Sequence, residues 1–179
     1  MSSQPITFRA PWCRSLVVIS VVVTLVCFAV CAPLAAVGQK WRPWGALLGI
    51  LPALLPAGAA PFLIRGYILT DDSLLIRRLF WPTTISLAGL RAVRHDPAAM
   101  RWSIRTCGNG GLFSITGFYW NKKLGSYRAF VTDPARSVII RLAKRTLVVS
   151  PENPAEFAAR LQERISPPPT TTEAAGSGR

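Results

Sequence analysis

Residues 16–37, LVVISVVVTLVCFAVCAPLAAV, and residues 44–64, WGALLGILPALLPAGAAPFLI, are two apolar stretches without a charged side chain. At about 1.5 Å per helical residue, each is long enough to cross the roughly 30 Å hydrocarbon core of a bilayer. Because six residues separate them, the sequence predicts a membrane α-helical hairpin. Residues 1–15 precede it, and a soluble domain (65–166) and a disordered tail (167–179) follow.

The charge of the chain points to acidic partners. Lys and Arg outnumber Asp and Glu by 21 to 8, a formal net charge of +13. Residues 65–166 hold 16 Lys and Arg against 7 Asp and Glu, so +9 of this excess lies on the soluble domain. A basic domain tethered beside a membrane faces anionic lipid headgroups. Nucleic acid is the other common acidic partner, and it is unlikely here because no recognition motif accompanies the charge.

Positive charges around the apolar stretches predict the orientation. The outer flanks carry five, Arg9, Arg14, Arg65, Arg77 and Arg78, whereas the loop between the stretches carries Lys40 and Arg42. The positive-inside rule then places both termini and the domain on the cytoplasmic side of the inner membrane. Two alternatives stay open: the first stretch can be a cleaved signal peptide, or the proline-bearing second stretch can dip into the bilayer and return, which puts the domain outside.

The soluble domain shows a β pattern followed by one helix. Seven short strands are predicted, over residues 66–70, 74–80, 101–106, 112–120, 127–132, 137–142 and 146–149. Asn153, Pro154 and Glu156 have the spacing of a capping box. Phe157, Leu161 and Ile165 follow at i, i+4 and i+8, which predicts an amphipathic helix. The order favours a small antiparallel barrel or sandwich with a closing helix.

Three segments resemble membrane-anchored bacterial proteins with a pleckstrin-homology-like (PH-like) domain. They are GYILTDDSLLIRRLFWPTTISL, GNGGLFSITGFYWNKKLGSYRAFVTDPARSVIIR and LVVSPENPAEFAARLQER. The family patterns fall on residues 67–76, 108–125, 132–140 and 148–157. The resemblance implies an all-β PH-like barrel, partly open and built of two sheets, closed at one end by the C-terminal α-helix. It does not imply an enzyme.

No residue pattern in the chain indicates catalysis, a metal or a cofactor. The only histidine, His95, precedes Asp96 and Pro97 without a nucleophile or further metal ligands, so a surface turn is the better interpretation. Asp71 and Asp72 fit a β-turn. The glycine-rich run at 108–111 joins two strands rather than opening a helix, which favours a hairpin turn over a phosphate loop. No C-x-x-C pair is present among the four cysteines.

The basic residues of the domain are the candidate site. Lysine and arginine near aromatic side chains can rest on a headgroup layer, each contributing about 1 kcal/mol near an anionic surface. The sequence thus predicts a non-enzymatic module at the cytoplasmic membrane face that binds anionic lipid headgroups or an unknown protein partner. The alternative is a structural subunit of a larger membrane complex. The candidate residues are Arg77, Arg78, Arg91, Arg94, Lys122, Lys123 and Arg128.

Overall fold

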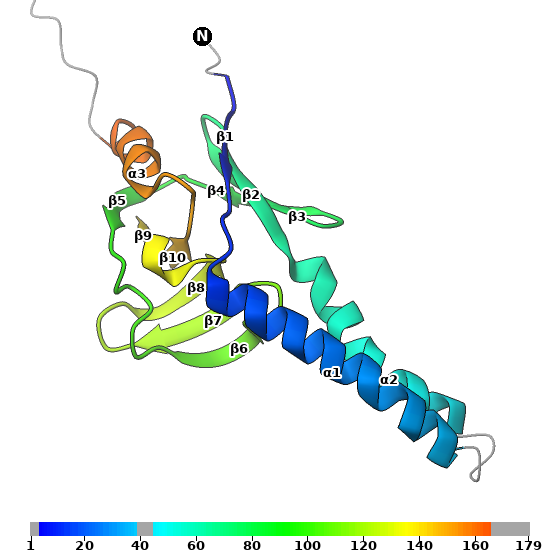
Figure 1. The fold of residues 1–179 in the computed structure, drawn as a ribbon. Helices are drawn as coiled ribbons and strands as arrows, with labels where there is room; N and C mark the ends of the chain where they lie inside the picture. Colours follow the sequence, from blue (N-terminus) through cyan, green and yellow to red (C-terminus); the bar gives the residue numbers. More distant parts are fainter. Residues whose placement is uncertain (1–3, 39–44, 166–179) are drawn as a thin grey trace, which may run out of the picture.

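The computed structural model describes residues 4–38 and 45–165, in which two β-sheets pack face to face and two helices leave together from one end (Figure 1). The predicted inter-helix loop and tail lie outside the described residues. The first sheet has the order β1 (Ile6–Arg9), β2 (Ile64–Leu69), β3 (Ser73–Arg78), β4 (Pro82–Ser86). The second has the order β5 (Leu90–His95), β9 (Val138–Leu142), β10 (Thr146–Val149), β8 (Gly125–Val131), β7 (Ile115–Asn121), β6 (Ile104–Gly110). Neighbours are antiparallel except for the parallel pair β10 and β8.

The two apolar stretches form helices of different length. α1 (Arg14–Gly38) contains 24 residues, Arg14–Val37, that are long and apolar enough to cross a membrane. α2 (Gly45–Ala59) has 15 residues and continues into a 3₁₀ turn, η1 (Ala60–Phe62). Among the described residues only α1 reaches the length of a membrane span, whereas the sequence predicted two spans. The second stretch falls short because its helix tightens at the proline-bearing turn and its last residue, Ile64, begins β2.

α1 and α2 lie against one another. A Cβ atom placed on Gly49 would stand 2.7 Å from the Cβ atom of Ala35, closer than real Cβ atoms approach. Glycine is therefore needed where the two helix backbones come together, as in many packed membrane helices. Pro52 and Pro56 lie inside α2.

The strand β1 was missed by the sequence analysis, which placed no element before the first apolar stretch. It pairs with β2 along its whole length, from Ile6 opposite Leu69 to Arg9 opposite Gly66. Phe8 is buried, and its ring meets that of Phe157 edge-on with the centroids 5.1 Å apart. The segment before α1 and the segment after α2 thus share one sheet, so both helices attach to the same body.

Strand alternation and one helix face build the core between the sheets. The first sheet contributes fully buried residues such as Tyr67 and Ile76, and the second contributes Phe130 and Ile140. The helix α3 (Pro154–Gln162) adds Phe157 and Leu161, both fully buried. Burial of such large apolar side chains stabilises the fold by about 1.5–3 kcal/mol each.

Two expectations about the domain need correction. No described strand of one sheet is hydrogen-bonded to a strand of the other, so the sheets do not close into a barrel. The chain instead turns from β4 to β5 through Gly89, whose φ of 74° suits glycine. β4 begins at Pro82, which its position at the edge of the sheet permits. The Asn153 side chain does not cap α3 but donates to the Glu156 carboxylate at 3.3 Å.

Candidate functional site: a pocket between α2 and the sheets

A pocket of about 410 Å³ lies where the end of α2 meets the open space between the sheets. Gly58, Ala59 and Phe62 form its helical wall. Arg78 enters it from β3, and Arg128 and Phe130 enter it from β8. Phe118 of β7 completes the apolar lining. The pocket therefore lies at the end of the domain from which α2 leaves.

Two arginines share the aromatic floor of this pocket. The guanidinium carbon of Arg78 lies 5.4 Å from the centroid of the Phe130 ring, and that of Arg128 lies 4.8 Å from the same centroid. Arg78 also lies 5.3 Å from the Phe62 ring, and Arg128 lies 5.5 Å from the Phe118 ring. These cation–π contacts hold both charges over apolar surface.

No acidic group balances these charges. Among the described residues neither arginine takes part in an ion pair, and the Nε of Arg78 is buried without a hydrogen-bond partner. Burial lowers the pKa of Arg78, and the nearby charge of Arg128 lowers it further. The pocket thus combines positive charge, an unsatisfied donor and apolar walls, which is an environment suited to an anion with an apolar portion.

Two glycines, Gly108 and Gly117, bring β6 and β7 close together in the wall of the pocket. Gly108 and Gly117 have φ angles of 120° and 139°. A Cβ atom on Gly117 would lie 2.1 Å from the carbonyl oxygen of Cys107, and one on Gly108 would lie 2.3 Å from that of Thr116. Only glycine allows this close approach of the two strands.

Exposed aromatic side chains extend outward from two residues of the pocket lining, Phe62 and Phe118. Phe62 in η1 contacts Trp81, which stacks on Phe80 at the turn between β3 and β4. Phe118 and Trp120 stand on the uncovered face of β7. Their exposed fractions range from 39 to 71%, which is high for aromatic groups that lie near one another. This aromatic rim consists of Phe62, Phe80, Trp81, Phe118 and Trp120.

The structure brings together two of the seven predicted site residues, Arg78 and Arg128. Arg77 points to the outer face of the first sheet, beside Arg9 and Arg65. Arg91 and Arg94 are exposed on β5, at the opposite edge of the second sheet from β6. Lys122 and Lys123 lie in the turn between β7 and β8, and Lys123 forms an ion pair with Asp96.

The aromatic partners of Arg78 and Arg128 were not predicted from the sequence. Arg78 was predicted together with Arg77 to contact anionic headgroups or a partner, whereas the alternation of β3 places the two side chains on opposite faces. The alternation across residues 73–78 was the available signal, since it assigns Arg78 to the same face as the buried Leu74 and Ile76. The role of Phe130 depends on tertiary packing.

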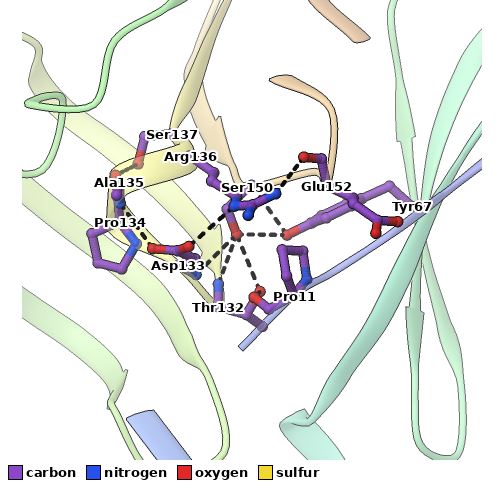
Figure 2. Close-up of polar contacts among 10 residues, drawn as sticks. All are labelled: Pro11, Tyr67, Thr132, Asp133, Pro134, Ala135, Arg136, Ser137, Ser150 and Glu152. Carbon is purple, nitrogen blue, oxygen red and sulfur yellow. Dashed lines mark hydrogen bonds and ion pairs between the residues drawn. The ribbon is translucent and has the colours of Figure 1, made fainter. Parts of the chain in front are cut away.

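Residues of the family-like patterns meet in a separate buried network (Figure 2). The Oγ atom of Ser150 accepts hydrogen bonds from the backbone N–H groups of Thr132 (2.8 Å) and Asp133 (3.2 Å). The Tyr67 hydroxyl donates to the Phe130 carbonyl (2.7 Å) and accepts from the Ser150 N–H (3.2 Å). Burial raises the pKa of Tyr67 to about 12.

The same network holds the segment that leads into α1. Thr132 donates through Oγ1 to the Pro11 carbonyl (2.8 Å), and its own carbonyl accepts from the Cys13 N–H (3.1 Å). The Glu152 N–H donates to the Arg9 carbonyl (2.9 Å). Each of these groups has a partner, which indicates a structural role: the network fixes the base of α1 to β8 and β10.

The other candidates of the sequence analysis are in structural roles. Asp96 accepts hydrogen bonds from Lys123 and from the Ala98 N–H, and the hydrogen bond from Lys123 lowers the pKa of this carboxyl group. His95 ends β5 beside it. Asn109 accepts from the Gly111 and Leu112 N–H groups in the turn between β6 and β7. Among the described residues no cluster of His, Cys, Asp or Glu could hold a metal.

The family model described as Bacterial PH domain matches residues 65–165. This is more than half of the chain. The protein belongs to the bacterial PH domain family. No curated protein and no solved structure matches the chain. Domains of this kind are generally non-enzymatic interaction modules, and nothing in the described site shows catalysis. The match begins at residue 65. β1, which adds an edge strand to the first sheet of this PH domain, therefore lies before the matched segment, and α1 and α2 separate the two in the sequence.

Proposed function

We propose that this protein is a membrane-anchored interaction module, with its PH domain held against the anionic cytoplasmic face of the inner membrane by α1 and α2. The observation that carries the proposal is the pairing of β1 with β2. It makes the chain leave the domain in α1 and return to it in α2. A membrane entered by these helices then lies at one end of the domain, and the N-terminal and C-terminal segments lie on the same side.

The helix surfaces support the anchor. Leu25 and Phe28 of α1 and Leu51 of α2 are about 60% exposed, and such side chains are stable in lipid rather than in water. α2 and η1 together span about 28 Å at 1.5 and 2.0 Å per residue, close to the roughly 30 Å bilayer core. A bilayer thins locally around a helix that is slightly shorter than its hydrocarbon core, so this small difference in length is accommodated. The paired helices therefore suit a hairpin in the bilayer.

The distribution of charge supports the orientation of the domain. The end that carries the helices has the aromatic rim and the arginines Arg9, Arg65, Arg77, Arg78 and Arg128. The other end, formed by the turn between β2 and β3 and by α3 (Figure 1), has mixed charge: Asp71, Asp72 and Glu156 lie there together with Arg160 and Arg164. Aromatic rings favour the membrane interface, and arginines favour anionic headgroups.

The anchor is tested on the full chain expressed in bacteria. We expect it to stay in the membrane pellet after a urea wash, whereas a Val22→Arg/Leu25→Arg variant is released because charge in the middle of α1 opposes insertion. A matched Thr7→Arg/Gln4→Arg variant, with the same added charge in the segment before α1, stays in the pellet. Release of the unmodified chain by urea would reject the anchor.

Orientation is tested with a variant that keeps Cys107, which is exposed, and has serine at the other three cysteines. A membrane-impermeant maleimide is expected to label it in inside-out vesicles and not in intact spheroplasts. The opposite pattern would place the domain outside the cytoplasm.

An anchored chain that binds anionic and neutral membranes alike would favour a protein partner over lipid headgroups.

A further inference from the structure

The pair formed by Arg78 and Arg128 is unusual because no acidic group among the described residues neutralises its positive charge. Each guanidinium rests on Phe130, and each meets a second ring, yet no carboxylate approaches either. A buried donor without a partner, such as the Nε of Arg78, is uncommon in folded proteins and favours a missing acceptor. Two arginines that present several N–H donors match the oxygens of a phosphate group.

The pocket also continues onto a strip of apolar helix surface. Leu51, Leu54, Leu55 and Gly58 follow one another at i, i+3, i+4 and i+7, which places them on one face of α2. The three leucines are between 55 and 62% exposed, and a Cβ atom on Gly58 would meet nothing within 4 Å. Gly58 forms part of the pocket wall. A molecule with a phosphate in the pocket therefore has an apolar path along α2 for its chains.

We propose that the pocket binds the phosphate group of one anionic phospholipid, with its acyl chains lying along the Leu51–Gly58 face of α2. This inference rests on the proposed function, because the α2 surface must be in the bilayer. It goes further by assigning the headgroup contact to Arg78 and Arg128 rather than to basic residues over the whole surface. The volume of about 410 Å³ is within the range of small-molecule pockets, and it leaves room for a phosphate and a glycerol moiety.

Native mass spectrometry of the full chain in neutral detergent tests the site. The probes are dioctanoyl phosphatidic acid and phosphatidylglycerol, with dioctanoyl phosphatidylcholine as the zwitterionic lipid and glycerol 3-phosphate as a phosphate without chains. We expect one phosphatidic acid or phosphatidylglycerol to be retained, with at least tenfold lower occupancy for phosphatidylcholine and for glycerol 3-phosphate. Equal retention of glycerol 3-phosphate would identify a soluble phosphate ester as the ligand and overturn the lipid assignment.

A matched set of variants separates the site from general charge. Arg78→Gln/Arg128→Gln is expected to lower lipid occupancy at least tenfold, whereas Arg77→Gln/Arg141→Gln removes the same charge from two exposed positions on β3 and β9 and leaves occupancy unchanged. An equal loss in the two double variants would overturn the proposal. The urea wash of the proposed function does not depend on these arginines, so failure of the anchor and failure of the pocket are observed separately.

Thermal unfolding in the same detergent distinguishes a ligand site from a structural one. Without lipid, we expect Arg78→Gln to melt close to the unmodified chain, because relief of the unpaired buried Nε and of the like-charge contact with Arg128 offsets the loss of the cation–π contacts with Phe62 and Phe130. Phosphatidic acid is expected to raise the melting temperature of the unmodified chain and not that of Arg78→Gln/Arg128→Gln. A large loss of stability in lipid-free Arg78→Gln would show that the arginine serves packing, and the proposal would fall.

Discussion

Ser150 connects three segments through one hydroxyl group. Its Oγ atom accepts from Thr132 and Asp133 on the chain after β8 and lies beside the Tyr67 hydroxyl of the first sheet. Replacing it with alanine leaves the buried N–H of Thr132 and the part-buried N–H of Asp133 without this acceptor, and a buried group left unpaired costs about 1–3 kcal/mol of folding free energy. We expect Ser150→Ala to lower the melting temperature of the full chain clearly, and Ser126→Ala, at an exposed position on β8, to leave it nearly unchanged. Equal melting of the two variants would contradict the network.

Tyr67 makes stability depend on alkaline pH. Its pKa is raised to about 12 by burial in the folded chain, whereas an unfolded tyrosine titrates near 10. The folded state thus keeps a proton that the unfolded state loses, so stability is complete below about pH 10 and declines as the pH rises toward 12. The decline is about 2.3 kcal/mol at pH 12, where half of the folded tyrosine is ionised, and it reaches about 2.7 kcal/mol only at higher pH.

The measurement is the melting temperature between pH 9 and 12 for the unmodified chain and for Tyr67→Phe. The difference between them should shrink as the pH rises, because the variant lacks the titrating hydroxyl group. A difference that stays constant across this range would show that Tyr67 does not govern the alkaline response.

Individual residues were predicted unevenly from the sequence, for a physical reason. Local patterns indicated that Phe157 and Leu161 face the core, and both are buried. The seven basic residues had no such pattern relating them, because their positions depend on which strands become neighbours. Lys123 is paired with Asp96 across 27 residues, and Arg78 shares a ring with Arg128 across 50.

The strand β1 is the element that links the anchor to the domain. The Phe8 ring is buried in the core against Phe157. Truncating such a side chain to alanine lowers the free energy of unfolding by about 3–5 kcal/mol. Phe8→Ala is therefore expected to destabilise the domain strongly, although the residue lies before the matched family segment. Thr7→Ala, exposed on the same strand, is the control and should change unfolding little. If both variants unfold alike, β1 does not belong to the folded domain.

The hairpin of β6 and β7 depends on Gly117. Its φ of 139° and the 2.1 Å approach of a Cβ atom to the Cys107 carbonyl oxygen exclude a side chain. Gly111 is the matched control, since its φ of 134° is similar but open space surrounds it. Gly111→Ala bears conformational strain alone, on the order of 1–3 kcal/mol. Gly117→Ala adds backbone overlap, so it should lose more stability in urea titration; the reverse order would contradict the strand geometry.

Elements with a strong period were predicted, and elements fixed by tertiary pairing were not. α1 and α3 follow from their apolar patterns. β1, β4 and β5 have four to six residues with weak alternation, and they become strands through pairing with β2, β3 and β9. The absence of strand pairing between the two sheets could likewise not be predicted from the sequence, because the strand order depends on the whole fold.

At the scale of the whole molecule, the open sandwich and the helix pair form one arrangement. The two sheets share no strand pair among the described residues, and the arginine pocket and the aromatic rim lie at the end from which the helices leave. α3 and the turn between β2 and β3 lie at the opposite end (Figure 1). We therefore predict that the domain takes one orientation on a membrane, with the aromatic rim at the headgroups and α3 facing away from them.

Spin-label accessibility in anionic proteoliposomes tests this orientation most directly. Full-length, otherwise cysteine-free variants carry a label at Phe80→Cys in the aromatic rim or at Glu156→Cys on α3, both exposed positions. We predict that the label at residue 80 collides more with oxygen than with a water-soluble nickel chelate, and that the label at residue 156 shows the reverse. Equal, water-like accessibility at both sites would contradict the account.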